Sequence, residues 1–356
     1  MTGNGAGSAA GVGVSGPARL RQALDELVAD GAPGALAELR DETGTWKLAS
    51  GVAELGATQP VDAAGWFRIG SVTKTFTATV VLQLAGEGRL GLDDTVQRWV
   101  PGAVPGAAEI TVRQLLSHTS GLYNYTRDLT TEGILRDRLR RWSPHEIVMH
   151  AGRQAPEFQP GASRAYNNTG YVLLGMVIEQ VTGCPYGEQI VRRILYPLEL
   201  RHTLIGDSEL LPEPHAHGYL AVRGKPVDIT VYNPSQAGAA GGMVSTAADL
   251  NRFFSALLTG ALLRTGELRE LQTTIATGTP GVESGLGVTR YDLPDDVTVW
   301  GKDGSFHGYH TWSFHTADAR RQLTVSMTAA LTGRPTTHDL LARVATVFGP
   351  PENRRR

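Results

Sequence analysis

The chain has 356 residues, of which 41% are apolar and 19% are charged, and its formal net charge is -2. It can therefore bury a large core, and its charge balance gives no reason to expect nucleic acid or a membrane surface as a partner. Cys184 is the single cysteine, so an intramolecular disulfide is excluded and a reducing compartment fits the sequence.

The two ends of the chain differ in composition from the rest. Residues 1–16 are mostly Gly, Ala, Ser and Val, without the basic start and apolar centre of a secretory signal. We expect a disordered leader over residues 1–16, a single domain over residues 17–350 and a solvated tail over residues 351–356. No apolar run reaches the length of a membrane span, so we expect a cytoplasmic protein.

The first part of the chain predicts a helix, a strand pair and a second helix. Helical periodicity covers residues 18–27. Two strand-like runs, residues 35–40 and 45–52, flank a polar turn and predict an antiparallel hairpin. Apolar residues then recur at helical spacing over residues 75–84, until two glycines end the pattern.

The middle of the chain is mainly helical, and strands return near its end. Helices are expected at residues 110–116, 144–151, 171–181, 187–195, 247–258 and 338–347, and strands at residues 285–291, 297–301, 310–315 and 323–329. This order predicts an α+β fold, in which both chain ends build one antiparallel sheet flanked by helices. The sheet lobe would comprise about residues 17–68 and 270–350, with an inserted helical lobe over about residues 69–269.

Ser71 and Lys74 form the first candidate for chemistry, an S-x-x-K motif at the start of a predicted helix. One helical turn brings the serine hydroxyl beside the lysine amine, and a desolvated lysine can accept the serine proton. The free N–H groups of the helix N-terminus favour negative charge there. On its own the motif more often means a capping serine and a surface lysine. A phosphate loop is excluded because Thr73 stands where glycine is required.

Tyr166 and Asn168 form a second polar motif, immediately before a strongly apolar helical segment. A phenol near cations can lose its proton and act as a base, and an asparagine amide can orient both a lysine and a substrate carbonyl. The alternative is a loop tyrosine followed by an asparagine helix cap.

A third motif, Lys302-Asp303-Gly304-Ser305, lies at the end of a predicted strand and is rich in glycine. Glycine allows a substrate to approach the backbone closely, so N–H groups of this segment could stabilise an oxyanion. Lys302 would supply a positive charge near Tyr166. A basic, glycine-rich hairpin without catalytic function is the alternative.

The three motifs in this order resemble those of the penicillin-recognising serine enzymes. Within that family, the chain is similar to the group of class C β-lactamases, Streptomyces-type D-alanyl-D-alanine carboxypeptidases, and related esterases and transacylases. The resemblance covers about residues 20–348 and is most specific at residues 68–74, 115–122 and 166–171.

The resemblance implies a β-lactamase-like fold and an acyl-enzyme mechanism that uses no cofactor. Ser71 would attack a carbonyl, and the N–H groups of Ser71 and Ser305 would bind the oxyanion. The other implied roles are proton transfer by Lys74 and Tyr166, orientation by Asn168, positive charge from Lys302, and substrate contacts from Asp303, Gly304 and Tyr123.

The third motif departs from the family pattern. Asp303 stands where the carboxypeptidases have a hydroxyl that, with an arginine on the preceding strand, helps bind the substrate carboxylate. Thr289 takes the place of that arginine, and Arg290 is shifted by one residue, which turns a strand side chain to the other face. Like charges about 4 Å apart repel by about 1 kcal/mol in water and by several kcal/mol at an effective dielectric constant of about 20. Asp303 should therefore disfavour substrates that end in a free carboxylate, unless Lys302 neutralises it.

These features predict a serine acyl-transfer enzyme that acts on a small-molecule ester, amide or peptide without a free carboxylate. The acyl group would pass to water or to an amine, a chemistry suited to small-molecule biosynthesis. The alternatives are a D-alanyl-D-alanine carboxypeptidase or class C-like β-lactamase, and a ligand-binding homologue without catalytic activity. The sequence leaves the oligomeric state open.

The histidines do not form a metal-binding pattern. Two groups of histidines lie close together in the sequence, His215 with His217, and His307 with His310 and His315. Neither group has a nearby cluster of Asp, Glu or Cys that would complete a set of zinc ligands. We therefore expect no metal. His118 is interpreted as a structural hydrogen-bonding residue.

Overall fold

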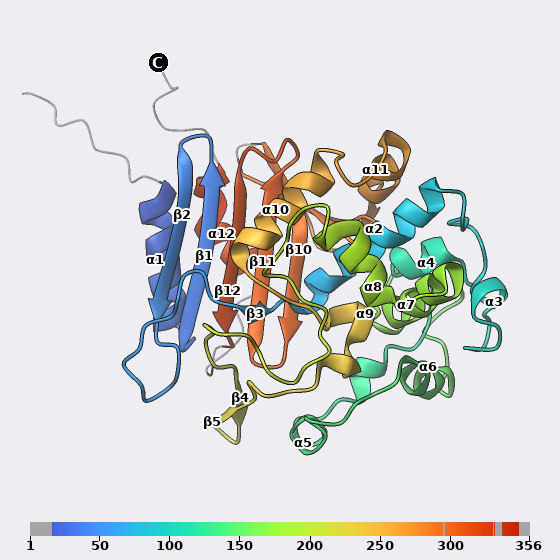
Figure 1. Ribbon diagram of the computed structural model, residues 1–356, viewed down its shortest axis with the longest axis horizontal. Coiled ribbons are helices and arrows are strands. Elements are labelled where there is room, and N and C mark those ends of the chain that lie inside the picture. Colours follow the sequence, from blue (N-terminus) through green and yellow to red (C-terminus); the bar gives the residue numbers. More distant parts are fainter. Residues whose placement is uncertain (1–15, 295, 330, 332–336, 349–356) are drawn as a thin grey trace, which may run out of the picture.

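A central antiparallel sheet organises the computed structural model, which describes residues 16–294, 296–329, 331 and 337–348 (Figure 1). The expected tail over residues 351–356, and the expected leader up to residue 15, lie outside the described residues. The strands are β1 (Gly34–Asp41), β2 (Gly44–Gly51), β3 (Phe67–Arg68), β4 (Tyr219–Val222), β5 (Lys225–Asp228), β6 (Val244–Ser245), β7 (Ile275–Ala276), β8 (Val282–Ser284), β9 (Thr289–Leu293), β10 (Val297–Phe306), β11 (Tyr309–Thr316) and β12 (Gln322–Thr328).

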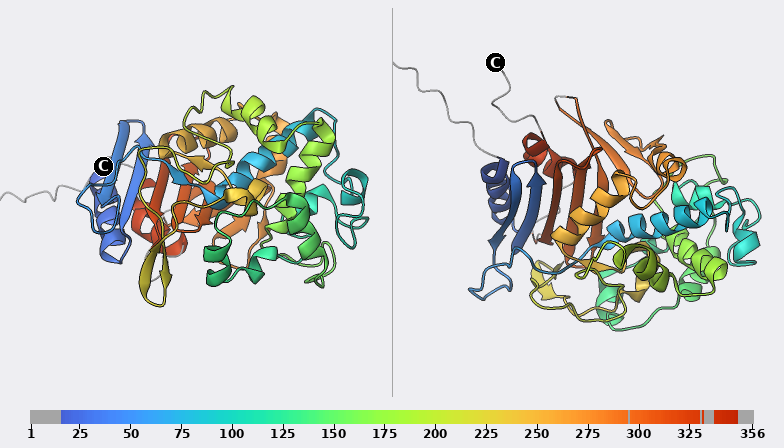
Figure 2. Two further views of the ribbon diagram at one scale, coloured as in Figure 1. Left: turned by 60° about the horizontal axis from the view of Figure 1, so that its bottom comes forward. Right: turned by 45° about the horizontal axis from the view of Figure 1, so that its top comes forward.

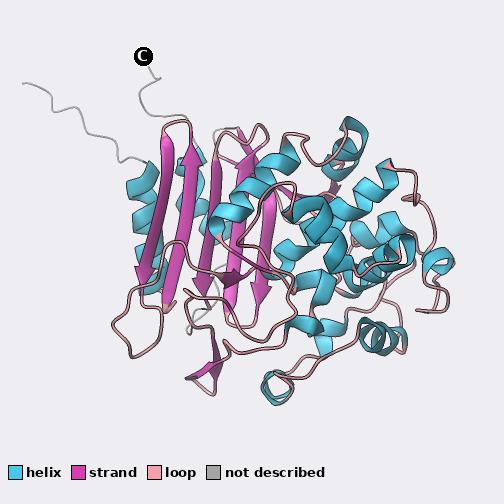
Figure 3. Ribbon diagram, in the orientation of Figure 1, coloured by secondary structure: helices cyan, strands magenta, loops and turns pink. Residues whose placement is uncertain are grey.

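The helices surround this sheet and fill the space beside it (Figure 3). They are α1 (Gly16–Ala29), α2 (Thr73–Gly86), α3 (Val96–Trp99), α4 (Val112–Leu116), α5 (Thr131–Arg136), α6 (Pro144–Gly152), α7 (Thr169–Thr182), α8 (Tyr186–Ile190), α9 (Gly238–Gly241), α10 (Ala247–Leu258), α11 (Thr265–Gln272) and α12 (Thr337–Phe348). Short 3₁₀ turns are η1 (Gly70–Val72), η2 (Tyr125–Asp128) and η4 (Pro234–Gln236), and the π-helical turn is η3 (Val191–Leu195).

The sheet joins the two ends of the chain. Its strand order in the described residues is β2-β1-β12-β11-β10-β9-β8-β7, and β1 pairs antiparallel with β12 in the register Ala37↔Val325. The expected α+β fold, with one antiparallel sheet built from both chain ends, is confirmed. The strand that carries the third motif, β10, therefore lies inside the sheet and not at its edge.

Each face of the sheet packs on a different core. Ala35, Ala37 and Leu39 of β1 belong to the core under α1 and α12, whereas Leu36 belongs to the larger core on the other side. This alternation follows from the two-residue period of a strand. Figure 2 shows α1 and α12 on one face of the sheet and α10 on the other. The α10 segment, which we expected in the helical lobe, thus packs on the sheet, against β1, β11 and β12.

Helix α2 runs through the interior and carries buried side chains on all its sides. Phe76 of α2 stacks on Phe253 of α10, with ring centroids 3.7 Å apart, and neither ring is exposed. The hydroxyls of Thr75 and Thr77 donate to the carbonyl oxygens of Gly287 and Ala239 at 2.7 and 2.8 Å. Because its polar groups are satisfied, α2 can hold the segment that precedes it in a fixed position inside the molecule.

Three predicted elements differ from the structure. The expected strand over residues 285–291 begins only at Thr289, in β9, because Gly287 adopts a positive φ of 86° and residues 285–288 form the turn between β8 and β9. The expected strand over residues 297–301 continues to Phe306, so the third motif is part of β10 and not at a strand end. The expected helix over residues 187–195 changes from α-helical to π-helical hydrogen bonding after Ile190.

Substitution of Phe253 tests whether the contact between α2 and α10 supports the fold. We expect Phe253→Ala to lower the free energy of unfolding by about 3–5 kcal/mol, because it leaves a cavity against Phe76. Leu139→Ala, at a side chain that is 55% exposed, should change it by less than about 0.5 kcal/mol. Chemical denaturation of both variants measures the difference, and equal midpoints would contradict the prediction.

Candidate active site

Ser71 lies in the turn η1, between the short strand β3 and helix α2. Gly70 has a positive φ of 51°, and a Cβ atom there would lie 2.5 Å from the carbonyl oxygen of Ser305. A Cβ atom at Gly304 would collide with the carbonyl oxygen of Ile69. Glycine is required at both positions, because the backbones of η1 and β10 touch. The contact brings the backbone of Ser305 next to Ser71, as an oxyanion hole requires.

Lys74 is fully buried on the first turn of α2 and points at the nucleophile candidate. Its Nζ atom donates to Ser71 Oγ at 3.1 Å, to Asn168 Oδ1 at 2.7 Å and to the Ala240 carbonyl oxygen at 2.6 Å. Burial lowers the pKa of Lys74 below its usual value, although the nearby Tyr166 acts against this shift. The geometry thus places a lysine with a reduced pKa within hydrogen-bonding distance of a serine hydroxyl.

Tyr166 lies beside Lys74 and comes from the loop before α7. Its ring centroid lies 4.9 Å from Nζ of Lys74 and 5.1 Å from Nζ of Lys302. Burial by itself raises the pKa of Tyr166, but the charges of Lys74 and Lys302 and hydrogen bonding with Lys74 and Ser71 lower the pKa below its usual value overall. The phenol of Tyr166 can therefore exchange a proton with Ser71 more readily than a free tyrosine.

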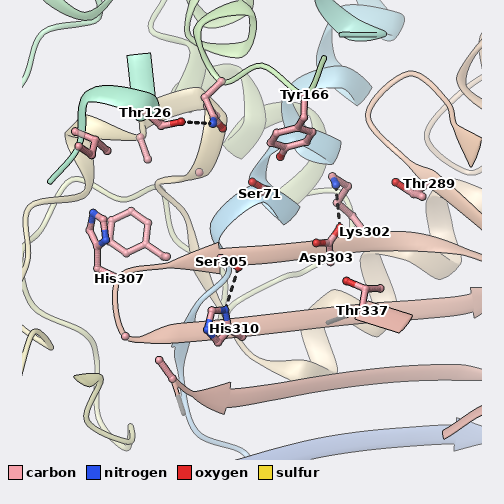
Figure 4. Close-up of a pocket in the computed structure, with 18 of the residues that line it drawn as sticks. Ser71, Thr126, Tyr166, Thr289, Lys302, Asp303, Ser305, His307, His310 and Thr337 are labelled. Carbon is pink, nitrogen blue, oxygen red and sulfur yellow. Dashed lines mark hydrogen bonds and ion pairs between the residues drawn. The ribbon is translucent and has the colours of Figure 1, made fainter. Parts of the chain in front are cut away.

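Asn168 links Lys74 to the opposite wall of the site. Its Oδ1 atom accepts from Lys74, while its Nδ2 atom donates to Asn124 Oδ1 at 3.3 Å and to Thr126 Oγ1 at 3.2 Å. Figure 4 shows this contact between Thr126 and the neighbouring amide. Because the Asn168 amide bonds to Lys74 of α2 on one side and to Asn124 and Thr126 of the η2 segment on the other, the side chain holds Lys74 in one orientation.

His118 supports the loop that carries Tyr166. Its ring lies 4.5 Å from the Tyr166 ring, its Nδ1 atom accepts from the backbone N–H of Asn167 at 3.2 Å, and its carbonyl oxygen accepts from Ala165 N–H at 3.1 Å. Burial and the charges of nearby cations hold the pKa of His118 well below its usual range. It is a neutral hydrogen-bonding residue of the scaffold, as the sequence predicted.

Lys302 and Asp303 form an ion pair beside Tyr166, drawn in Figure 4. Nζ of Lys302 lies 3.1 Å from Oδ1 of Asp303, and the hydroxyl of the buried Tyr291 donates to the same oxygen at 3.4 Å. Burial alone would lower the pKa of Lys302, but Asp303 and Tyr166 raise it overall. Lys302 therefore stays charged at neutral pH, and it partly offsets the negative charge of Asp303.

The register of β9 decides which side chain faces the site from the preceding strand. Thr289 pairs with Gly301 and Arg290 pairs with Trp300. Thr289 lines the cavity, whereas Arg290 is outside its lining and forms ion pairs with Glu283 and Asp292 at 2.9 and 2.8 Å. The expected one-residue shift is confirmed, and β9 presents no arginine to the site.

A cavity of about 1080 Å³ collects most of the predicted site residues. This volume is at the upper end of the range of small-molecule sites, about 300–1,000 Å³. Its lining includes Ser71, Tyr166, Asn168, Lys302, Asp303 and Ser305. Lys74 lies beneath this lining, and Gly304 lies against the η1 backbone.

Tyr123 is the predicted substrate contact that the structure does not bring into the cavity. Its hydroxyl donates to Asp128 at 2.6 Å, and its carbonyl oxygen accepts from Thr169. Tyr125 and Thr126, from the adjacent turn η2, line the cavity instead. The prediction that Tyr123 contacts the substrate is therefore wrong, because its side chain bonds to Asp128 instead of lining the cavity. The sequence does not reveal the direction of this side chain.

Several lining residues were missed by the sequence analysis. Arg164 lines the cavity two residues before Tyr166, and its buried Nε atom has no hydrogen-bond partner. Its place in the motif loop was the signal that could have found it. The lining residues Gln236 and Phe306 gave no such signal, because they reach the cavity only through the packing of η4 and the end of β10.

The histidines named as metal candidates have separate partners. His217 bonds to Asp228, His310 to Ser305, and His315 to Ser313. Within the described ranges, no group of three or more His, Cys, Asp or Glu side chains is placed to hold a metal ion. In the same part of the chain, none of the helices combines the length and the apolar character needed to cross a membrane.

The family model called Beta-lactamase matches residues 20–347. The chain belongs to the Beta-lactamase family. Among curated relatives, Penicillin-binding protein 4* of Bacillus subtilis is 28% identical over 296 residues, which are 77% of this chain and 63% of that protein. The chain thus spans less than two thirds of the length of this relative.

Solved structures of the Beta-lactamase family cover almost the whole described domain. A D-stereospecific amidohydrolase from Streptomyces sp. is 41% identical, with a TM-score of 0.86 over 91% of this chain and 97% of its own. D-amino acid amidase from Ochrobactrum anthropi SV3 is 29% identical, with a TM-score of 0.82 over 92% of this chain and 97% of its own. This Beta-lactamase family member is an enzyme of the serine hydrolase type, as the sequence predicted.

The pH dependence of turnover tests the charges around Tyr166. Lys302 lowers the pKa values of Lys74 and Tyr166, whereas Asp303 raises that of Lys74. The acidic limb of kcat/KM reports the pKa of the base in the free enzyme. We therefore expect Lys302→Met to move this limb to higher pH and Asp303→Asn to move it to lower pH.

Asp292→Asn is the control, because it also removes one negative charge but lies outside the cavity lining. It should leave the acidic limb of kcat/KM unchanged. A shift in the same direction for Lys302→Met and Asp303→Asn would contradict the proposed arrangement of charges.

Proposed function

We propose that this protein forms an acyl-enzyme on Ser71 from an amide or ester and then transfers the acyl group to water or to an amine. One observation carries this proposal, the hydrogen bond from the buried Lys74 to Ser71 Oγ at 3.1 Å beside the phenol of Tyr166. A serine that only capped a helix would not need a buried amine and a phenol with lowered pKa values next to its hydroxyl.

The chemistry follows from the positions of these groups. The bond between Ser71 Oγ and the substrate carbonyl carbon forms as the serine proton passes to the Lys74–Tyr166 pair, from which Tyr166 then donates it to the leaving group. The backbone N–H groups of Ser71 and Ser305 stabilise the oxyanion, and loss of one such donor typically costs about 3 kcal/mol. The bond to the leaving group then breaks as its nitrogen or oxygen takes the proton. Water or an amine repeats these steps in reverse to release the acyl group.

Asp303 supports a substrate without a free carboxylate beside the scissile bond. It is a carboxylate in the cavity lining, next to the general acid Tyr166 and therefore next to the leaving group. No arginine of β9 offsets it, because Arg290 forms its ion pairs outside the cavity. A leaving group that carries a carboxylate would be repelled by the negative charge of Asp303, whereas a neutral leaving group would not be repelled.

Amino acid amides are the substrate class that we propose first. Two of the similar solved structures are a D-stereospecific amidohydrolase and a D-amino acid amidase, and an amide of this kind has no terminal carboxylate. A D-alanyl-D-alanine carboxypeptidase or penicillin-binding activity is the second candidate, favoured by the similarity to Penicillin-binding protein 4*. The two candidate substrate classes differ in the charge of the leaving group, which carries a carboxylate in the second class and is neutral in the first.

Mass spectrometry of the intact protein tests the nucleophile. An activated ester of a D-amino acid should add the mass of its acyl group to Ser71. Ser71→Ala should not be labelled, and its kcat should be lower by at least about a thousandfold. A penicillin should give no stable adduct. A stable penicillin adduct would favour the second candidate, and full activity of Ser71→Ala would overturn the mechanism.

Substitution of Asp303 tests the substrate class. We expect Asp303→Asn to raise kcat/KM for a D-alanyl-D-alanine donor, relative to D-alanine amide, by about tenfold, because a charge repulsion of about 1–2 kcal/mol is removed. Asp292→Asn should leave this ratio unchanged. A ratio that is the same for all three proteins would show that Asp303 does not select against the carboxylate.

A further inference from the structure

Four apolar side chains larger than alanine line the catalytic cavity without belonging to either hydrophobic core of the described residues. They are Leu129, Ile134, Leu220 and Phe306. Apolar side chains that face a cavity and pack on neither core offer surface that a bound apolar group can cover. They therefore mark a part of the cavity that differs from its charged part around Lys302 and Asp303.

These residues come from three segments that meet at one edge of the molecule. Ile134 lies in α5, Leu220 in β4, and Phe306 at the end of β10. Figure 1 shows α5, the β4–β5 hairpin and the turn after β10 together at the lower edge. None of the residues of α5 is buried, and Ile134 is the residue of this helix that lines the cavity.

The direction of the chemistry decides which part of the substrate reaches this edge. The leaving group must receive its proton from Tyr166, so it lies on the side of Tyr166 and Lys302. Figure 4 shows Lys302 and Asp303 on one side of Ser71 and His307 on the other. The acyl part, which stays on Ser71, therefore extends toward His307 and its neighbour Phe306.

The four apolar residues on this acyl side have the neutral His307 as a neighbour, and no carboxylate, lysine or arginine of the cavity lining lies among them. Burial lowers the pKa of His307 to about 4, so its ring is neutral, and its Nε2 atom lies 3.4 Å from Oε1 of Gln236. The carboxylate, lysine and arginine side chains of the lining are Asp303, Lys302 and Arg164. Lys302 contacts the ring of Tyr166, Asp303 forms an ion pair with Lys302, and Arg164 precedes Tyr166 by two residues. His310 also lines the cavity, where its Nδ1 atom lies 3.0 Å from Ser305 Oγ. A charged acyl side chain would lose its hydration here without gaining a partner.

Phe306 has a fixed position within this wall. Its ring meets the ring of Tyr232 edge to face at 5.4 Å, and the guanidinium of the buried Arg68 lies 5.3 Å from its centroid. Arg68 is itself held by the carbonyl oxygens of Glu209, Thr230 and Tyr232. Because this support lies outside the cavity, Phe306 presents a rigid apolar surface to the acyl group.

We propose that Leu129, Ile134, Leu220 and Phe306 form the subsite for the acyl side chain, and that it selects acyl donors with a bulky, uncharged apolar group. Aromatic and branched aliphatic aminoacyl groups are the class that fits. This assignment rests on the proposed function of Ser71, because it depends on which side the leaving group occupies. The subsite selects the acyl donor, whereas Asp303 acts on the leaving group.

A series of p-nitroanilides tests the subsite, since their leaving group is constant and uncharged. The donors are the alanyl, leucyl, phenylalanyl and glutamyl derivatives, each as both enantiomers. We expect the phenylalanyl donor to exceed the alanyl donor of the same configuration in kcat/KM by tenfold or more in the unmodified protein, and the glutamyl donor to be the poorest. Equal values for alanyl and phenylalanyl donors would overturn the assignment.

Ile134→Ala and Phe306→Leu test the wall from two different segments. Each should lower the ratio of kcat/KM for phenylalanyl over alanyl by about tenfold, because lost apolar contact weakens only the larger donor. Leu139→Ala, which removes an exposed leucine outside the cavity lining, should leave the ratio unchanged. An unchanged ratio in both wall variants would contradict the proposal.

Leu129→Arg gives a test by gain of activity. A cation on the acyl side should raise kcat/KM for the glutamyl donor relative to the leucyl donor by about tenfold or more. If this variant still turns over leucyl donor without such a change, the subsite is assigned wrongly. If no donor labels Ser71 in the unmodified protein by mass spectrometry, the proposed function itself fails, and the subsite fails with it.

Discussion

The contact between the turn η1 and strand β10 is the constraint on which the site depends. Gly70 and Gly304 allow the two backbones to meet, and any Cβ atom there would collide with the opposite chain. This contact connects a segment near the N-terminus of the buried helix α2 to a strand from the last fifth of the sequence. It fixes the positions of Ser71, Lys302 and the N–H group of Ser305 together, so the proposed nucleophile and the proposed oxyanion donors share one rigid frame.

Around this frame, Lys74, Lys302 and the phenol of Tyr166 influence one another electrostatically. Lys74 loses proton affinity through burial, and Lys302 keeps its proton because Asp303 and Tyr166 stabilise the charge. The phenol of Tyr166 lies about equally close to both ammonium groups, at 4.9 and 5.1 Å from its centroid. The pKa values of the two lysines are thus shifted in opposite directions because their neighbours differ.

The cavity has two chemically distinct sides that come from different parts of the fold. The sheet supplies Lys302, Asp303 and Thr289, whose positions follow from strand register. The apolar side is supplied by short segments at the edge of the sheet, including a helix that buries none of its residues. Strands hold the reacting groups within narrow limits, whereas loops and short helices can change their side chains without disturbing the core. This division lets members of one family share chemistry and differ in substrate.

Local sequence determined the elements and the reactive residues. Two strand-like runs around a polar turn predicted the β1–β2 hairpin, and helical spacing predicted α2. The S-x-x-K and Tyr-x-Asn motifs indicated Ser71, Lys74, Tyr166 and Asn168 as candidates, because each motif is a short stretch of chain. The tertiary structure decided what depends on distant segments. Only it shows that Tyr123 points to Asp128 and away from the cavity, that β10 continues through Lys302, and that Arg164, Gln236 and Phe306 line the site. Side-chain direction in a turn and the meeting of separate loops arise from packing, which no local pattern encodes.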